Sequence, residues 1–316
     1  MNDVRNTDIP REQAVVFGKR QNLVGIRRTS PKNSKNEADD FAVILVTAGM
    51  LHSCGPYRLH VALARSLADA GIPSLRFDLS GIGESMPDDL PGTSLERAAR
   101  EIGAAIDCLQ VQGVRRVALF GLCSGADDAF YAALHDRRIV GLFALDGLGY
   151  RTQHYYWHRL TGHYGRKLFS LSKLRQVIRG QLEKPREQAN SLEPGADIRE
   201  FPSHAIAEKQ LLQLEERGFY AHFHYTGGVS QYYNYDAQFS DMFPQLTAEF
   251  ITSSYDATCD HTAFLCEHRD ALVQRVTAYF VGLVKKLPHQ SANPRLSIPL
   301  LPAIDGNFAD HTIAVV

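Results

Sequence analysis

A cysteine stands at the centre of the glycine-flanked stretch "GLCSG", between an apolar run and a helix-like segment. The spacing is that of a nucleophile elbow, G-x-S-x-G, with cysteine in place of the central serine. Gly121 and Gly125 leave room around the turn only if Cys123 is the central residue. Centring the motif on Ser124 would put Leu122 at a position that needs a small side chain. We therefore predict that Cys123 is a nucleophile, with Ser124 and a plain glycine-rich turn as the alternatives.

A thiol at this place would be activated by its surroundings. A helix expected to begin at about Ala126 would present its positive end and its unpaired N–H groups to the sulfur. A neighbouring imidazole would favour the thiolate, which is the reactive form, by forming an ion pair with it. The chemistry indicated is covalent acyl transfer by a Cys–His pair.

Strand-like and helix-like segments alternate around Cys123 and must position it. Strand character is found in "FAVILVT", "IPSLRFDL", "RRVALFG" and "IVGLFALDG", and helical spacing in "YRLHVALARSLADAG" and "ADDAFYAALHD". A long amphipathic helix is expected to begin at Ser94 and to end at Gly113. The stretch "QAVVFGKRQNLVGIRR" is typical of a β-hairpin. This order predicts an α/β fold, a mainly parallel sheet with helices on both faces.

The chain divides by composition into four parts. Residues 1–150 and 217–286 carry the strands and helices of one core. Residues 151–216 are basic, aromatic and helix-prone, then polar with prolines, and they predict either a substrate-covering cap or a plain surface insertion. Residues 287–316 are punctuated by prolines, and we expect them to form a surface tail.

The order of elements over residues 11 to 286 resembles the α/β-hydrolase fold. The resemblance rests on "VTAGM", "LRFDLSGIGES", "GLCSG" and "DHTAF", each after or before a predicted core element. The second of these stretches and "GLCSGA" also look like those of hydrolases found beside exosortase systems. The resemblance implies a helical cap after the sixth strand and a triad in the chain order nucleophile, acid, histidine.

The chain has 13 histidines, so only position singles one out as the base. His261 lies in "CDHTAF", between the last predicted strand and the last predicted helix. The resemblance places the histidine of the family in this loop. His268 is the close competitor, but it lies inside the helix-like segment.

The acid has two candidate positions. Most α/β-hydrolases place it a few residues after the seventh strand, where this chain has Ser230, which carries no negative charge. Asp236 follows and would reach the histidine only if its loop bends back. Thioesterase domains of nonribosomal peptide and polyketide assembly lines often carry the acid at the end of the sixth strand, in a pattern similar to "GLFALDG". This resemblance favours Asp146, whose alternative role is to cap a turn.

The oxyanion hole is expected to combine the N–H of Ser124 with an N–H from the loop after "VILVTAG". By position the second donor is Met50. Cys54 in the same loop and Cys259 near the histidine either line the site or are incidental small residues. Asp78 is expected to hold the "SGIGES" turn, which lacks the lysine of a phosphate-binding loop.

Composition excludes several classes of protein. The 316 residues have a formal net charge of -1 and are 44% hydrophobic, which gives no reason to expect nucleic acid or an anionic membrane as partner. No apolar run approaches the about 20 residues that span a bilayer, and the first residues lack a secretory signal. The five cysteines indicate reduced thiols in the cytoplasm. His154 and His158 have no third ligand nearby, so neither a metal nor another cofactor is expected.

Together these features predict a thioesterase or acyltransferase that acts on a small-molecule acyl substrate through an acyl-cysteine. A carrier-bound acyl group and a CoA thioester belong to this class of substrate. A lactone or ester hydrolase of the dienelactone-hydrolase type, which resembles this chain in its cysteine elbow, is an alternative. A non-catalytic binding protein on the same fold is another, and a membrane-associated role of the cap is a third.

Overall fold

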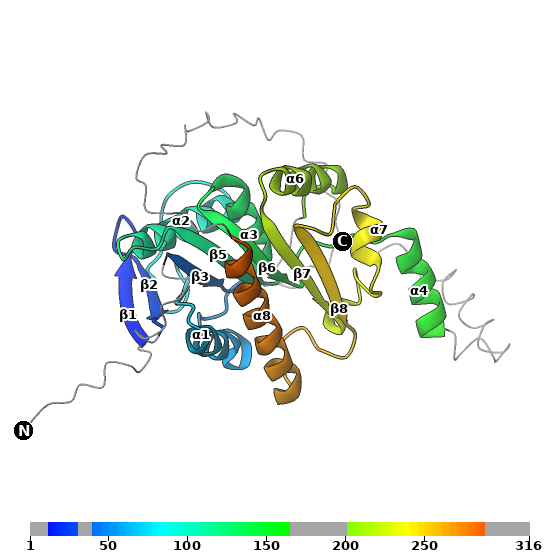
Figure 1. The fold of residues 1–316 in the computed structure, drawn as a ribbon, viewed down its shortest axis with the longest axis horizontal. Helices are drawn as coiled ribbons and strands as arrows, with labels where there is room; N and C mark the ends of the chain where they lie inside the picture. The colour runs from blue at the N-terminus through cyan, green and yellow to red at the C-terminus, as the bar shows by residue number, and fades with distance from the viewer. Residues whose placement is uncertain (1–11, 31–39, 165–200, 288–316) are drawn as a thin grey trace, which may run out of the picture.

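The computed structural model describes residues 12–30, 40–164 and 201–287. These residues form an eight-stranded sheet in the order β1-β2-β4-β3-β5-β6-β7-β8 (Figure 1). The strands are β1 Glu12–Phe17, β2 Leu23–Arg28, β3 Phe41–Val46, β4 Ser74–Phe77, β5 Arg116–Leu122, β6 Ile139–Leu145, β7 Tyr220–Thr226 and β8 Ile251–Asp256. Strands β1 and β2 pair antiparallel with each other, and β2 pairs antiparallel with β4, whereas the remaining neighbours pair in parallel.

The middle of the sheet is covered on both faces. Every residue of β3 and of β5 is buried, as their continuous apolar runs predict for parallel strands between two layers of helices. The helical elements are η1 Pro56–Arg58, α1 Leu59–Asp69, α2 Ser94–Gln110, α3 Ser124–His135, α4 Gln153–Tyr164, α6 His204–Glu216, η2 Gly227–Val229, α7 Gln238–Met242 and α8 Cys266–Lys286. The predicted fold class is therefore confirmed.

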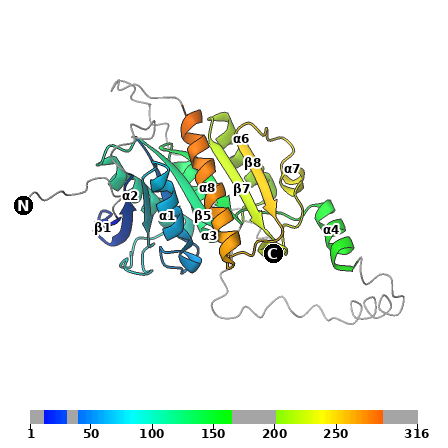
Figure 2. The same cartoon turned by 60° about the horizontal axis from the view of Figure 1, so that its bottom comes forward.

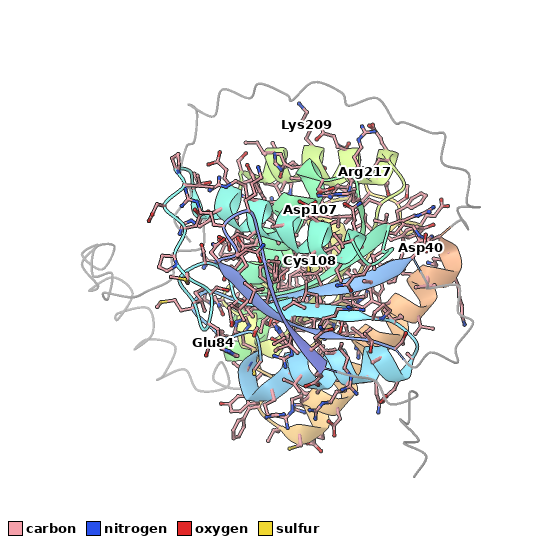
Figure 3. All side chains as sticks on the ribbon, turned by 90° about the vertical axis from the view of Figure 1, so that its left-hand side faces the viewer. Asp40, Glu84, Asp107, Cys108, Lys209 and Arg217 are labelled. Atoms are coloured by element: carbon pink, nitrogen blue, oxygen red, sulfur yellow. The ribbon has the colours of Figure 1, made fainter. Side chains whose placement is uncertain are left out.

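Two apolar clusters hold the helices to the sheet. Helices α1 and α8 pack on one face (Figure 2), where their buried residues share a cluster with Phe41, Val43 and Leu45 of β3. Helices α2, α3 and α6 pack on the other face (Figure 3). Because α6 buries Ala207, Leu211 and Leu214 in that second cluster, it is part of the layer that covers the sheet.

Several sequence expectations can be compared with these elements. The predicted hairpin is confirmed by the β1–β2 register, in which Phe17 pairs with Leu23. The long helix begins at Ser94 as expected, but Thr93 caps it: Thr93 Oγ1 accepts from the Glu96 N–H, and the Glu96 carboxylate accepts from the Thr93 N–H. The helix after the elbow begins at Ser124, not at about Ala126, because the turn at Cys123 leads directly into it.

Parts of the predicted cap and the tail lie outside the described residues. Residues 165–200 fall between α4 and α6, and residues 288–316 follow α8. Within the described ranges, no helix is both long and apolar enough to cross a bilayer.

Candidate active site

Cys123 lies at the end of β5, in the turn that leads into α3. Its backbone has φ 55° and ψ −125°, a strained conformation for a residue other than glycine. A Cβ added to Gly121 would overlap the carbonyl oxygen of Gly125, and one added to Gly125 would overlap the carbonyl oxygen of Thr47. The two glycines therefore let β5, the helix start and the loop after β3 come together around the cysteine. This is the geometry of a nucleophile elbow centred on Cys123.

Ser124 occupies a different place in this turn. It is the first helical residue of α3, and its Oγ accepts a hydrogen bond from the backbone N–H of Gly49 at 2.7 Å. The hydroxyl thus ties the loop after β3 to the start of α3. Cys123 and not Ser124 has the strained elbow conformation.

Asp146 and His261 form an ion pair at the same edge of the sheet. The Nδ1–H of His261 donates to Oδ2 of Asp146 at 2.7 Å. Asp146 follows β6 and its side chain is fully buried, so its charge needs several donors. Thr226, the last residue of β7, supplies two of them: its N–H donates to Oδ1 at 2.6 Å and its hydroxyl to Oδ2 at 2.7 Å. The carboxylate is thereby fixed toward the imidazole.

The loop that carries His261 approaches β7 closely because of two glycines. A Cβ on Gly227 would overlap the carbonyl oxygen of Ala257, and a Cβ on Gly228 would overlap the backbone N of His261. Thr226 and these two glycines are not among the site residues predicted from the sequence. Their signal was the pair of glycines directly after a predicted core strand.

The charge of His261 follows from its two neighbours. The hydrogen bond to Asp146 and, next, the hydrogen bond to the sulfur of Cys123 raise the pKa of His261 to about 10, against the opposing effect of burial. The imidazole is therefore cationic at neutral pH. Asp146, His261 and Cys123 form one continuous chain of contacts.

The other acidic candidate lies elsewhere. Asp236 is exposed, and within the described ranges no hydrogen bond or ion pair joins it to His261. Ser230 is exposed as well, and its carbonyl oxygen accepts from the hydroxyl of Tyr155 at 3.1 Å. Of the two carboxylates considered, only Asp146 contacts the histidine.

The loop after β3 contacts Ser124, the residue after Cys123, through the N–H of Gly49. Residues 48–51 form a turn closed by the Leu51 N–H and the carbonyl oxygen of Ala48 at 3.0 Å. In the part of the chain that the structure describes, the N–H groups of Met50 and Ser124 have no acceptor. The Asp78 carboxylate accepts from the N–H of Ser53 and so holds the far end of this loop. The oxyanion-hole role of the N–H groups of Met50 and Ser124 stays a prediction.

The two neighbouring cysteines, Cys259 and Cys54, differ in their surroundings. Burial raises the pKa of Cys259 to about 12, so its thiol is neutral at physiological pH. The sulfur of Cys54 lies 3.8 Å from Nη1 of Arg76. Neither has a hydrogen bond to Cys123 among the contacts of the described residues.

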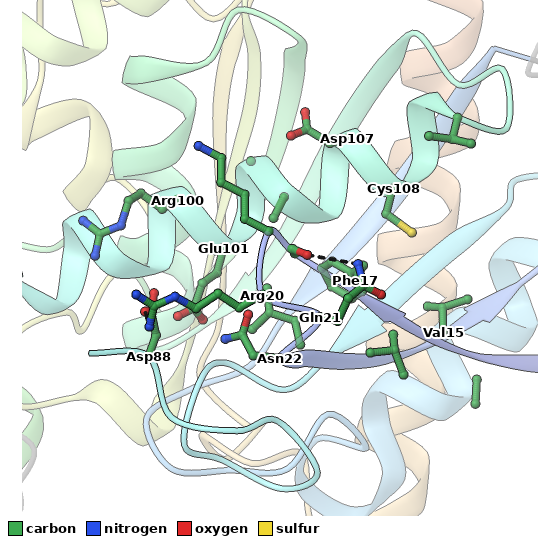
Figure 4. A pocket seen from close by; sticks show the side chains of 18 of the residues that line it. Val15, Phe17, Arg20, Gln21, Asn22, Asp88, Arg100, Glu101, Asp107 and Cys108 are labelled. Atoms are coloured by element: carbon green, nitrogen blue, oxygen red, sulfur yellow. Dashed lines mark hydrogen bonds and ion pairs between the residues drawn. The ribbon is translucent and has the colours of Figure 1, made fainter. Parts of the chain in front are cut away.

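A cavity of about 1060 Å³ lies away from these residues, between the β1–β2 hairpin and α2 (Figure 4). Phe17, Glu101 and Cys108 are among its lining side chains, whereas Cys123, Asp146 and His261 are not. Within the described ranges, no group of three His, Cys, Asp or Glu side chains is placed to bind a metal ion.

Comparison with known proteins shows the fold of this chain. No protein-family model matches the sequence, and no curated protein matches it either. Dienelactone hydrolase from Anabaena variabilis is similar in structure, with a TM-score of 0.52 and 15% identity over 86% of this chain and 98% of that one. The esterase domain of a Rhodothermus marinus protein has a TM-score of 0.51 and 13% identity over 86% of this chain and 99% of that one. The chain has the α/β-hydrolase fold.

Proposed function

We propose that this protein is a cysteine-dependent hydrolase or acyltransferase that acts on an ester or thioester through an acyl-cysteine intermediate. The observation that carries the proposal is the chain of contacts from Asp146 through His261 to Cys123, whose backbone has the conformation of a nucleophile elbow. A dienelactone hydrolase and an esterase domain are similar to this chain in fold. They agree with the proposed class of reaction.

In the first half of the reaction the sulfur of Cys123 attacks the acyl carbonyl carbon. The carbonyl π-electrons move to oxygen, and the N–H groups of Met50 and Ser124 donate to that oxyanion. When the tetrahedral intermediate collapses, the bond to the leaving group breaks, and Nε2–H of the His261 imidazolium protonates the departing oxygen or sulfur. The products are an acyl-cysteine and a free alcohol or thiol.

In the second half, neutral His261 takes a proton from water, or from an acceptor amine or alcohol, as that nucleophile attacks the thioester. The Cys123 thiolate leaves and the imidazolium forms again. Asp146 holds the ring in the correct tautomer and stabilises its positive charge throughout. An acyl-cysteine is itself a thioester, so exchange with a thioester substrate is close to thermoneutral. This favours thioester hydrolysis or acyl transfer over simple ester hydrolysis.

Lactone opening is the second candidate reaction. It uses the same steps, except that the leaving alcohol stays attached to the acyl group. The observation in its favour is the structural similarity to dienelactone hydrolase. We further propose a cytoplasmic location, in which reduced thiols persist, and a cap within the predicted range 151–216 that does not include α6, since α6 packs on the sheet.

Intact-mass spectrometry tests the proposal. The wild type, mixed with short acyl thioesters and quenched in acid, is expected to gain the mass of one acyl group, and Cys123→Ala is expected to gain none. Cys266→Ala is the matched control, because Cys266 is an exposed thiol at the start of α8. Acylation of Cys123→Ala equal to that of the wild type would eliminate the mechanism.

A further inference from the structure

Five large apolar side chains are exposed in the two loops that carry site residues. Met50 and Leu51 lie in the loop after β3, Tyr57 lies in η1 directly behind it, and Phe264 and Leu265 lie in the loop that carries His261. Exposed apolar side chains are normal when they are scattered, but a group around a candidate site calls for an explanation.

The rings of Tyr57 and Phe264 join the two loops. Their centroids are 5.0 Å apart at 70°, an edge-to-face contact, although the two residues are 53% and 58% exposed. We name Tyr57, Phe264 and Leu265 the aromatic shelf. Since one ring covers only part of the other, each keeps an open surface on which an apolar group can pack.

The backbone on both sides of the shelf is strained. Tyr57 has φ 47° and Arg58 has φ 64°, while Ala263 has φ 49°, and none of them is glycine. The Asp260 carboxylate fixes the histidine loop by accepting from the N–H groups of Thr262 and Phe264, each at 2.9 Å. Residues are held in such conformations when their surroundings fix them, and this strain gathers at binding sites.

The reaction geometry assigns one arm of the substrate to this shelf. Around the tetrahedral carbon, one substituent is the sulfur of Cys123 and one is the oxyanion, which faces the N–H groups of Met50 and Ser124. Of the two remaining arms, the leaving group must lie against Nε2 of His261, because that atom protonates it. Phe264 and Leu265 follow His261 by three and four residues in a loop that Asp260 keeps tight.

We propose that the aromatic shelf binds the leaving group, and that the substrates are esters or thioesters of an apolar, uncharged alcohol or thiol such as a long-chain or aryl one. This inference rests on the proposed function. It discriminates among the substrates of that function, because a CoA thiol presents a polar, charged arm that gains little from two aromatic rings and a leucine.

Leaving-group selectivity tests the inference. A series of butyrate esters and thioesters with alkyl leaving groups of similar basicity (ethyl, hexyl and 2-phenylethyl, with CoA among the thioesters) forms the same acyl-enzyme. In the wild type, kcat/KM for acylation is expected to be at least about tenfold higher for the hexyl and 2-phenylethyl members than for the ethyl and CoA members of the same bond type. Tyr57→Ala combined with Phe264→Ala should remove this preference and leave the deacylation rate unchanged.

Two further variants control the experiment. Val111→Ala removes an exposed apolar side chain at the far end of α2, and it should keep the preference. Phe264→Leu keeps an apolar surface and should retain part of the selectivity. This variant keeps the test decisive if the double variant folds poorly.

The outcomes separate the two proposals. Absence of any acyl-enzyme in the wild type overturns the proposed function and the shelf with it. An acyl-enzyme that forms without leaving-group preference, or with a preference that survives the double substitution, overturns the shelf alone. A preference lost only in the shelf variants supports both.

Discussion

Asp146 is the residue whose charge the site depends on most directly. Its hydrogen bond is the largest cause of the raised pKa of His261, so Asp146→Asn should lower that pKa from about 10 toward the ordinary value of 6.5. We expect kcat/KM to fall by about 100-fold or more, since the ring loses the partner that orients it. The pH profile of iodoacetamide labelling and the imidazole NMR shift measure the pKa change. Asp236→Asn is the control, and a larger loss there would move the acid to the later loop.

Ser124 offers a second test at the scale of single residues. Its Oγ holds the N–H of Gly49, so Ser124→Ala should loosen the loop that carries the Met50 donor. We expect kcat to drop by about tenfold, while the acyl mass still appears on Cys123. Serine-directed fluorophosphonates should label the wild type poorly. Strong labelling that Ser124→Ala abolishes would instead make Ser124 the nucleophile.

The same pKa governs one contribution to stability. The pKa of His261 is higher in the folded chain than in the unfolded chain. Its ion pair with Asp146 therefore stabilises the fold fully below about pH 6.5, and that stabilisation is lost as the pH rises through about 10. The free energies of unfolding of the wild type and of His261→Gln, measured in urea, should differ least at alkaline pH.

Among the elements, the turn after β7 decides whether the histidine loop can approach. Gly228→Ala should push the backbone of His261 away from Asp146, because the added Cβ would overlap that backbone. We expect a large loss of acylation rate with a smaller loss of stability. Gly282→Ala in α8 is the control, because a Cβ added there has no neighbour within 4 Å. This substitution should be neutral or should stabilise the fold by up to about 1 kcal/mol. Thermal unfolding and acylation rates of the two variants make the comparison, and equal acylation rates would exclude a positioning role for Gly228.

Much of the element order was predictable from sequence because central strands such as β3 and β6 are continuous apolar runs and helices such as α2 have one apolar face. The elbow was predictable because its signal is local: Gly121 and Gly125 lie on either side of Cys123 within five residues. The contacts between Asp146 and Thr226 and between Gly228 and His261 were not, because they join residues 80 and 33 positions apart across strands. The start of α2 at Ser94 was predictable, but its end was placed at Gly113, three residues beyond the observed end at Gln110.

At the scale of the whole molecule, two buried histidines, His60 and His224, and the half-buried His222 are expected to contribute to the response to acid. Burial lowers the pKa of His60 and His224 to about 3 and that of His222 to about 4, so all three are neutral in the folded chain at pH 7. The hydroxyl of Ser254 lies between His222 and His224, 2.8 and 2.7 Å from a ring nitrogen of each. In the unfolded chain these three histidines take up protons at about pH 6.5, whereas in the folded chain they do so only at about pH 4 or 3.

The stabilisation that these three neutral histidines contribute should therefore be complete above about pH 6.5 and should fall as the pH drops toward 4. Each buried histidine contributes at most about 1.4 kcal/mol per pH unit to this loss. Replacing both His222 and His224 by Gln should flatten the slope of the unfolding free energy between pH 6 and 4. Replacing the exposed His158 by Gln should leave it unchanged. An unchanged slope in the double variant would assign the acid sensitivity to other groups, and His261 is not among them, since its stabilising effect is constant in this range.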